Sequence, residues 1–537
     1  MIALLRQRLR RDRLQLLLWI LGTVALALAA VGGASSSYGT EKERTEVLAT
    51  VMANPVILLF RGLPSGAERA AFTLFLILPF LAMLAGFLST FLAVRHTRAE
   101  EELGRAELVA ATAAARLTPL LATIVHGVLA DVVLGLLVAA SFLSAGFPAS
   151  GSAVAGLAVA SVGLCFLGVG LAAGQIMRTS RGANALAVWL LVGTYVIAGL
   201  GNALGTPNDD LTRMESSPLA WFSPFGWAMN TRPYADDAVW PALLGIGAGA
   251  ALTLAAIGVQ SVRDIGAGIV PERRGRTDAP AALASGAGLV WRLTRGSVLG
   301  WAAGALVTGL LATSLAAVVN EIGTKVEAVQ RIFEALSDRG GLEEGLIVIF
   351  YIIVGVLAAC AAVQTVCRAR QEEAHGTAEA VLATAVDRVR WLAGYVGVAV
   401  LAVVLVAAAA VAGSALGVAG RGDEAGPLLR GAALAGAGQA AAACVFLALT
   451  ALVFVLLPRG TVAVGWTLVL LAVMVGLFGP LFSLPDWLAN ASPFAQTPTV
   501  SGDEIDPKGV WWLIAAAAAG IAAALGLMRR RELHPAG

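Results

Sequence analysis

The chain has 537 residues, of which 58% are hydrophobic and only 13% are charged, and its formal net charge is +2. With a mean hydropathy of +0.81, such a chain cannot bury its apolar side chains inside a soluble globule. Composition and charge therefore exclude a soluble globular protein and predict a polytopic membrane protein.

The predicted membrane spans are apolar segments, each long enough to supply the roughly 20 helical residues that cross a bilayer. Unbroken apolar runs contradict the alternating pattern of a membrane β-barrel, so we expect an all-α protein. Twelve such segments occur, at about residues 14–34, 69–94, 118–145, 152–177, 183–205, 240–262, 298–319, 345–367, 391–417, 429–457, 461–483 and 510–528.

Basic residues predict the orientation of these spans, because Lys and Arg are retained on the cytoplasmic side. With the N-terminus inside, cytoplasmic segments hold 25 of the 37 basic residues and 13 acidic ones, and external segments hold 12 basic and 21 acidic residues. The apolar start of the chain runs into five arginines and then into a full-length span without a clear cleavage site, so we expect an anchor. We predict a multi-pass protein of the cytoplasmic membrane with both termini in the cytoplasm.

The twelve predicted spans divide into two halves, residues 1–265 and 289–537, joined by a polar cytoplasmic linker at residues 266–288. Because six spans are an even number, the halves have the same orientation, and a pseudo-twofold axis along the membrane normal would relate them. Outside the membrane, residues 40–54 and 321–336 have amphipathic patterns. These two helices would either lie on the outer interface or cap a transport path.

A charged segment occurs once in each half and is the most specific signal in the chain. Residues 98–116 and 370–388 match at eleven of nineteen positions, without a gap and at a constant spacing of 272. The shared residues are Glu100, Glu101, Gly104, Glu107 and Arg116 in the first copy and Glu372, Glu373, Gly376, Glu379 and Arg388 in the second.

These glutamates oppose the positive bias of cytoplasmic loops, so we expect a soluble, complementary partner to dock on them. Glu100 and Glu107 are seven residues apart, which predicts that they share one face of a helix. The alternative is a solvated helix whose glutamates balance nearby arginines.

No motif for catalysis or nucleotide binding is present in the sequence. A P-loop requires Gly-Lys-[Ser/Thr], whereas Lys42, Lys325 and Lys508 follow Glu, Thr and Pro. The four histidines and four cysteines show no spacing typical of a metal site. We expect a transporter subunit and not an enzyme, with no metal and no cofactor on this chain.

Two ionisable residues, His126 and Asp131, lie within the third predicted span. Ionisable groups inside a membrane are costly and often functional. The positions 272 residues further on are Val398 and Val403, so the pair is not duplicated. A role in transport and a structural hydrogen bond to a neighbouring span are both open for Asp131.

These features resemble the permeases of type-2 ABC exporters, in particular the fused twelve-span form of actinobacterial drug and polyketide-antibiotic exporters such as the tetronasin type. The resemblance covers essentially the whole chain, and the doubled Glu-Glu-x-x-Gly-x-x-Glu segment between the second and third spans of each half is its most specific part. It implies the type-2 ABC exporter fold, with a basic elbow helix at residues 1–13 and coupling helices at about residues 96–116 and 368–390.

In that family each coupling helix sits in a cleft of an ATPase subunit. The resemblance therefore implies two copies of a separate ABC ATPase as partners, and ATP and Mg²⁺ would be bound by that ATPase. Membrane lipids and a hydrophobic small-molecule substrate are the other expected partners, and no nucleic acid is expected.

The resemblance also implies that the second and fifth spans of each half line the substrate path. Their aromatic, methionine and amide residues suit large apolar or amphipathic molecules, and packing against other helices or lipid is the alternative for each. The candidates are Phe75, Phe80, Met83, Phe87, Trp189, Tyr195, Asn202, Phe350, Tyr351, Trp466, Met474 and Phe478.

The function implied by the resemblance is export of hydrophobic or amphipathic drugs or antibiotics, driven by ATP hydrolysis on a separate subunit. Two alternatives remain. One is a lipid or glycolipid exporter of the same ABC class. The other is a twelve-span proton-coupled secondary drug transporter, which would need proton-carrying residues near the middle of the membrane.

Overall fold

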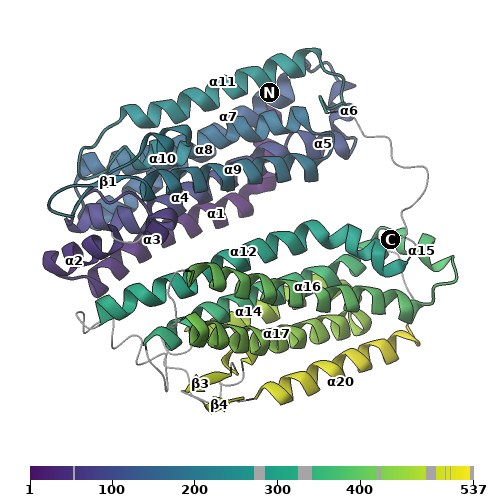
Figure 1. The fold of residues 1–537 in the computed structure, drawn as a ribbon. Helices are drawn as coiled ribbons and strands as arrows, with labels where there is room; N and C mark the ends of the chain where they lie inside the picture. Colours follow the sequence, from purple (N-terminus) through teal and green to yellow (C-terminus); the bar gives the residue numbers. More distant parts are fainter. Residues whose placement is uncertain are drawn as a thin grey trace. The chain divides into compact units, whose positions relative to one another are not determined.

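The computed structural model describes residues 1–52, 55–270, 283, 285–323, 342–419, 425–478, 492–496, 498–501, 504–507 and 509–531. These residues are mostly helical. The chain divides into two compact units, Met1–Arg274 and Gly275–Gly537 (Figure 1).

The first unit is built from long helices joined by short elements. In its described residues the long helices are α1 (Ile2–Ser37), α4 (Arg69–Arg95), α7 (Thr118–Ser144), α8 (Ala149–Ile176), α9 (Ser180–Ala203) and α11 (Trp240–Val262). The short elements are α2 (Glu41–Met52), α3 (Pro55–Phe60), α5 (Arg98–Glu102), α6 (Arg105–Ala110), the antiparallel strands β1 (Thr206–Pro207) and β2 (Met214–Glu215), η1 (Pro218–Phe222) and α10 (Pro224–Met229).

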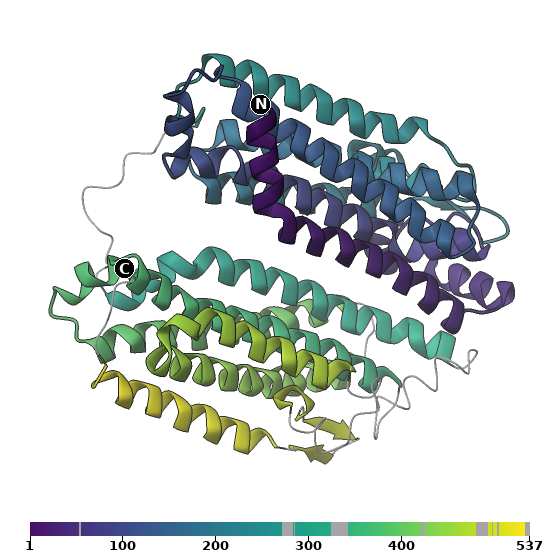
Figure 2. The same cartoon turned by 180° about the vertical axis from the view of Figure 1, so that it is seen from behind.

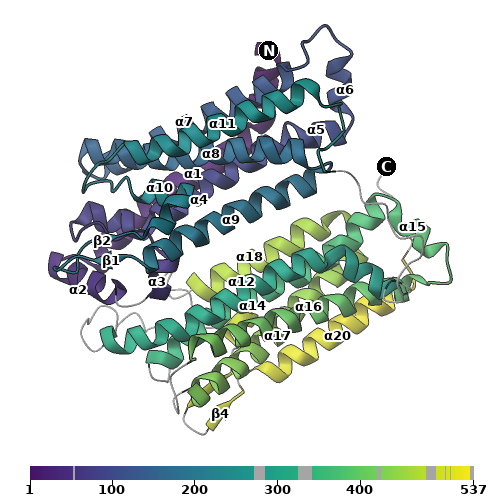
Figure 3. The ribbon, with the colours of Figure 1, turned by 45° about the horizontal axis from the view of Figure 1, so that its top comes forward.

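Helix α8 is the most enclosed helix of the first unit. It packs against α4, α7, α9 and α11 (Figure 3). Within its apolar stretch, 83% of the residues are buried. A helix that is apolar all round can be enclosed in this way. Small residues permit the close approach of its neighbours: a Cβ on Gly156 would lie 2.3 Å from the backbone oxygen of Gly135 on α7.

The second unit has a similar order of elements. Its described long helices are α12 (Gly286–Gly323), α14 (Leu342–Ala374), α16 (Arg388–Gly417), α17 (Ala425–Leu456), α18 (Thr461–Phe478) and α20 (Val510–Met528). Its described short elements are α15 (Thr377–Leu382), η4 (Pro458–Gly460), η5 (Pro493–Ala495) and the antiparallel strands β3 (Thr499–Ser501) and β4 (Glu504–Asp506).

The same helix pairs pack within each unit. The packing of α1 on α7 corresponds to that of α12 on α16, and the packing of α4 on α8 corresponds to that of α14 on α17. The contact between α8 and α11 likewise recurs between α17 and α20. The internal repeat of the sequence is therefore also a repeat of helix packing.

The prediction of a polytopic helical membrane protein is confirmed. Among the described residues, eleven helices are long and apolar enough to span a membrane, against twelve predicted spans. The difference falls on the predicted span at residues 461–483, where the apolar helix over Pro458–Val473 is shorter. Residues 479–491 lie outside the described part of the chain.

The predicted elbow helix at residues 1–13 is not a separate element. Helix α1 is continuous from Ile2 to Ser37, and it changes direction after its first turns (Figure 2). No glycine or proline occurs before Gly22, so nothing in the local sequence ends the helix between the basic segment and the apolar span.

The prediction that Glu100 and Glu107 share one continuous helix was wrong. Helix α5 ends at Glu102, and α6 begins at Arg105, after Gly104 with a φ of +70°. The second copy has the same break, because α15 begins after Gly376 with a φ of +73°. This left-handed conformation interrupts a helix, and glycine adopts it readily because it lacks a Cβ.

Helix α2 confirms the first predicted external helix as far as Met52. Its apolar side, which includes Leu48 and Val51, is buried in the core of the first unit. Thr40 and Glu43 form a reciprocal capping box at its start, and the hydrogen bonds from Thr40 hold the pKa of Glu43 below its usual value. The second predicted external helix, at residues 321–336, lies outside the described part of the chain after Gly323. Most of the predicted linker also lies outside the described residues.

Candidate functional site

The second glutamate of each repeated acidic segment is buried and bonded within its own unit. Glu101 accepts hydrogen bonds from Arg98 at 2.9 Å, from Arg263 at 2.6 Å and from the backbone N–H of Gly266 at 3.1 Å. The Glu101 side chain is only 7% exposed. Sequence reasoning placed this residue on the docking surface, whereas the structure places it inside the unit.

Glu373 occupies the equivalent position in the second unit. It accepts a hydrogen bond from Arg531 at 2.5 Å and forms an ion pair with Arg370 at 3.3 Å. Its side chain is 2% exposed. The buried glutamate and its two arginines are therefore duplicated along with the sequence motif.

The arginine that ends each repeated segment binds the backbone of the arginine that also holds the buried glutamate, namely Arg263 in the first unit and Arg531 in the second. Arg116 donates a hydrogen bond to the backbone oxygen of Arg263, and Arg388 donates one to that of Arg531 at 2.7 Å. Arg263 follows α11 directly, and Arg531 follows α20 by a few residues, so each lies beyond the last long helix of its unit. We call these contacts the terminal clamp: Glu101 and Arg116 on Arg263 in the first unit, and Glu373 and Arg388 on Arg531 in the second.

Further contacts fix α5 to the end of α8 and the start of α9. Arg98 is 1% exposed and donates to the backbone oxygen of Gly174 at 2.5 and 2.8 Å and to that of Ala267 at 2.8 Å. Glu102 accepts hydrogen bonds from the backbone N–H and the hydroxyl of Ser180 at 2.9 and 2.5 Å. The first segment is thus held by α8, by α9 and by the residues that follow α11.

Other residues of the repeated segments face outward. In the first unit Glu107 is exposed, and the neighbouring Leu103 and Leu108 are 61% and 72% exposed. In the second unit Glu379 and His375 are exposed. These side chains are accessible to a partner, and the two surfaces differ because the first presents two leucines.

The first glutamates of the two segments, Glu100 and Glu372, are partly exposed. Glu100 accepts a hydrogen bond from Arg11 of α1 at 2.7 Å and one from Arg105 at 3.3 Å. Glu372 is paired with Arg368 at 2.5 Å and accepts a hydrogen bond from the Thr377 hydroxyl at 2.5 Å. The alternative of glutamates that balance nearby arginines therefore describes this position in both copies.

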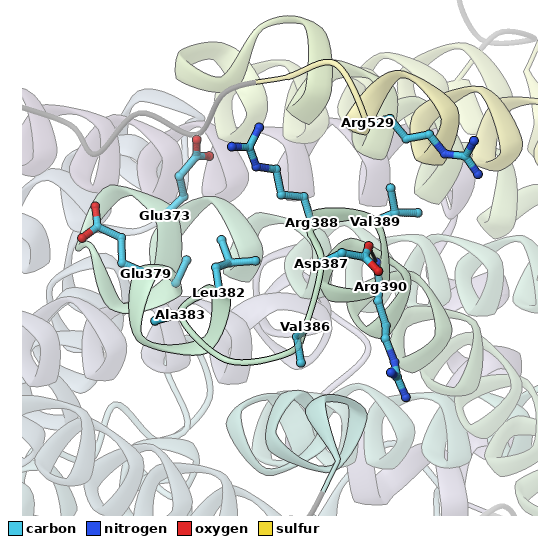
Figure 4. Close-up of a pocket in the computed structure, with 11 residues that line it drawn as sticks. Glu373, Glu379, Leu382, Ala383, Val386, Asp387, Arg388, Val389, Arg390 and Arg529 are labelled. Atoms are coloured by element: carbon cyan, nitrogen blue, oxygen red, sulfur yellow. Dashed lines mark hydrogen bonds between the residues drawn. The ribbon is translucent and has the colours of Figure 1, made fainter.

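A cavity opens beside each repeated segment. The one in the first unit has a volume of about 930 Å³ and extends from Glu101 to Asp264, beyond the end of α11. The one in the second unit has a volume of about 1110 Å³ and extends from Glu373 to Arg529, beyond the end of α20. Figure 4 shows the carboxylates of Glu373 and Glu379 on one side of this cavity and Arg388, Arg390 and Arg529 on the other.

The predicted substrate-path residues fall into two groups, although the helices that carry them are adjacent within each unit, with α4 on α9 and α14 on α18. Phe75, Asn202 and Tyr351 are buried in the packing of their own unit. Asn202 contacts the sulfur of Met229 at 3.2 Å, and the Tyr351 hydroxyl lies 3.0 Å from that of Ser414. These residues fit the packing alternative.

The other path candidates are at least partly exposed. Trp189 is 67% exposed and Trp466 is 37% exposed. Five more are intermediate, namely Phe80, Met83, Phe87, Tyr195 and Phe350. The side chains of Met474 and Phe478 lie outside the described part of α18.

Asp131 is fully buried and accepts a hydrogen bond from the Ser89 hydroxyl of α4 at 2.6 Å. The structural hydrogen bond to a neighbouring span is therefore present. His126 is also fully buried, and it faces Asp12 and His96. Sequence reasoning missed this cluster because its members are far apart in the chain and come together only through the packing of α1 on α4 and α7.

Comparisons with known proteins relate the chain to a permease of a drug efflux system. A family model described as the C-terminal domain of the multidrug efflux system permease Rv1217c matches residues 283–529. The chain is 33% identical over 548 aligned residues to the multidrug efflux system permease protein Rv1217c of Mycobacterium tuberculosis. That match covers 99% of the chain and 95% of the relative.

Proposed function

The chain belongs to the family of the multidrug efflux system permease Rv1217c, and on this premise we propose that it is the membrane-spanning subunit of an ATP-driven type-2 ABC exporter. Its substrates would be hydrophobic or amphipathic drugs or antibiotics. The two repeated acidic segments would face the cytoplasm, each docked on one copy of a separate ATPase that binds ATP and Mg²⁺.

The observation that carries this proposal is the duplicated terminal clamp. Each repeated segment is bonded to the end of the last long helix of its unit, through Glu101 and Arg263 in one case and Glu373 and Arg531 in the other. A solvated loop would not need the two buried guanidinium groups of Arg98 and Arg263 on the largely buried carboxylate of Glu101. A braced segment can pass the movement of a docked subunit to the membrane helices.

The exposed side chains define the kind of partner that fits. Leu103 and Leu108 offer apolar contacts beside the carboxylate of Glu107. A cleft with an apolar centre and a basic rim would complement this surface, since polar rims around apolar centres are typical of protein interfaces. The second surface has His375 and Glu379 instead, so we propose unequal affinities for the two docked subunits.

Coexpression with the cognate ATPase and native mass spectrometry test the proposal. We expect a complex of one permease chain with two ATPase chains, whose ATP hydrolysis is stimulated by a transported drug. The permease alone should hydrolyse no ATP. A stable one-to-one complex, or transport without the ATPase, would contradict the proposal.

Transport assays in inverted vesicles separate this function from its alternatives. ATP together with the ATPase should drive uptake, and a proton gradient alone should not. Uptake driven by the proton gradient alone would identify a secondary transporter. Inhibition of drug uptake by excess lipid or glycolipid would favour the lipid-exporting branch of the same class.

A further inference from the structure

Asp12, His96 and His126 form a buried cluster at the cytoplasmic side of the first unit. Asp12 lies on α1, His96 directly follows α4, and His126 lies on α7. Their exposures are 3%, 2% and 0%, and their potential ligand atoms all lie within 4.8 Å of one another.

The contacts of the cluster converge on the carboxylate. His96 Nε2 contacts Asp12 Oδ2, and His126 Nδ1 lies 4.0 Å from the same oxygen. The two imidazole rings have centroids 5.3 Å apart. One carboxylate oxygen and two imidazoles thus lie close together, with His96 and Asp12 in direct contact.

His126 has an unusual position in this cluster. Neither of its ring nitrogens has a hydrogen-bond partner among the described residues. Buried polar side-chain atoms normally have a partner, because an unsatisfied one forfeits its hydration without compensation. A ligand that bonds to one ring nitrogen would remove part of this penalty.

We propose that Asp12, His96 and His126 bind one divalent transition-metal ion, of which Zn²⁺ fits the donor set best. Two imidazole nitrogens and one carboxylate oxygen form a common three-residue zinc set, which leaves a fourth position for water. With metal–ligand bonds of about 2.0–2.2 Å, tetrahedral ligands lie roughly 3.4 Å apart. Binding would therefore shorten the 4.0 Å spacing between His126 Nδ1 and Asp12 Oδ2 and move His96 Nε2 and Asp12 Oδ2, which are in direct contact, apart by a small side-chain movement.

The donor atoms and the surrounding charges bear on the class of metal. Arg95 lies 3.2 Å from Asp12 Oδ1, and Arg8 is anchored nearby on the backbone oxygen of Pro119 at 2.8 Å and the Thr123 hydroxyl at 2.6 Å. Their positive charges oppose any divalent cation, so binding would depend on the strength of the metal–imidazole bonds. Mg²⁺ and Ca²⁺ also prefer all-oxygen sites, so imidazole ligands favour a transition metal.

The site opens to a cavity and is not repeated at the equivalent positions of the second unit. His96 and Arg8 also line the cavity of about 930 Å³ beside the first repeated segment, which gives an ion an entry path. The residues 272 positions after His96 and His126 are Arg368 and Val398, which cannot form the same site. A bound ion would hold α1 against α4 and α7, next to the contact between Arg11 and Glu100. The proposed site does not depend on whether ATP drives transport.

Metal titration of the chelator-treated permease in detergent tests this site. Co²⁺ serves as a visible probe, because its absorption distinguishes tetrahedral from octahedral coordination, and Zn²⁺ is measured by equilibrium dialysis. We expect one tetrahedral Co²⁺ per chain, its displacement by one Zn²⁺, and a higher apparent melting temperature with Zn²⁺. Mg²⁺ should neither compete nor stabilise.

Variants assign the ligands. His126→Gln and His96→Gln should each weaken Zn²⁺ binding by at least about 100-fold, since even outer-shell changes weaken metal sites 10–100-fold. His375→Gln, an exposed histidine of the second unit, and Asp131→Asn, a buried carboxyl of the same helix as His126, should keep wild-type binding. If His126→Gln is aggregated, Asp12→Asn tests the same ligand set.

The proposal is overturned by three results. One is the absence of stoichiometric binding, which would mean that water alone satisfies His126. Another is octahedral Co²⁺ binding that all the variants retain, which would place the ion on the surface. The third is unchanged affinity in a well-folded His126→Gln variant.

Discussion

Arg263 donates a hydrogen bond to Glu101 at 2.6 Å, across 162 residues of the chain. Arg531 makes the same contact with Glu373 at 2.5 Å, across 158 residues. The acidic motif is therefore a composite of buried anchors and exposed side chains. Glu101 and Glu373 hold each segment in place, and exposed side chains on either side of the glycine, such as Glu107 and Glu379, are available to a partner.

Removal of one anchor should destabilise its unit. Glu101→Ala would leave Arg98 and Arg263 buried without their carboxylate, and loss of one member of a buried pair commonly costs about 3–5 kcal/mol. We expect a marked decrease in the apparent melting temperature in detergent. Glu107→Ala, which truncates an exposed glutamate of the same segment, should change it little.

A compensating variant distinguishes this mechanism from a general effect of truncation. Glu101→Ala combined with Arg263→Met should recover part of the lost stability, because the uncompensated charge is removed. If Glu101→Ala and Glu107→Ala unfold at the same temperature, the clamp has no structural role.

The docking surfaces should respond to charge reversal without loss of folding. In the presence of the ATPase, Glu107→Lys combined with Glu379→Lys should abolish drug-stimulated ATP hydrolysis, because an attractive contact at each surface becomes repulsive. Expression and melting temperature should stay at wild-type values. Glu41→Lys, an exposed glutamate at the start of α2, is the matched control and should keep full activity.

The single variants should differ from each other. Leu103 and Leu108 add apolar contacts in the first unit, so Glu107→Lys alone should weaken docking less than Glu379→Lys does. Titration of the ATPase against immobilised permease measures both affinities. Full stimulation in the double variant would place the docking site elsewhere.

The sequence predicted most of the span positions, because apolar runs of about 20 residues have few other structures available to them. It did not predict the break at Gly104, since an isolated glycine is also tolerated inside helices. It could not separate Glu101 from Glu107 either. Burial of a side chain in a short charged segment depends on what packs against it, and Arg263 lies 162 residues away.

The cluster of Asp12, His96 and His126 was beyond sequence reasoning for the same reason. Its residues come from three separate parts of the first unit, and the acidic residues near them in the sequence, Glu100 after His96 and Asp131 after His126, are not part of the cluster. Asp131 was different, because sequence reasoning had already named a hydrogen bond to a neighbouring span as one explanation for this carboxyl group. The structure supplies that bond from Ser89.

Asp131 separates the two classes of transporter. Asparagine keeps an acceptor for the Ser89 hydroxyl but cannot carry a proton, so Asp131→Asn should retain most ATP-driven uptake into inverted vesicles. Ser89→Ala, which removes only the hydrogen bond, is the control for a local packing defect. Loss of uptake in Asp131→Asn but not in Ser89→Ala would point to proton coupling.

The path candidates should separate according to their burial. Tyr351 has no exposed surface, and its hydroxyl lies 3.0 Å from that of Ser414, so Tyr351→Ala should lower stability by about 3–5 kcal/mol, as large aromatic truncations in a core do. Trp189 is 67% exposed, and Trp189→Ala should leave the melting temperature near the wild-type value.

If Trp189 contacts substrate, its truncation should change the relative uptake of several drugs more than it changes basal ATP hydrolysis, because different ligands depend on different aromatic contacts. Trp240→Ala, which truncates another exposed tryptophan of the first unit, outside the predicted path helices, is the matched control and should leave the drug profile unchanged. Identical drug profiles for Trp189→Ala and Trp240→Ala would assign Trp189 to the lipid-facing surface.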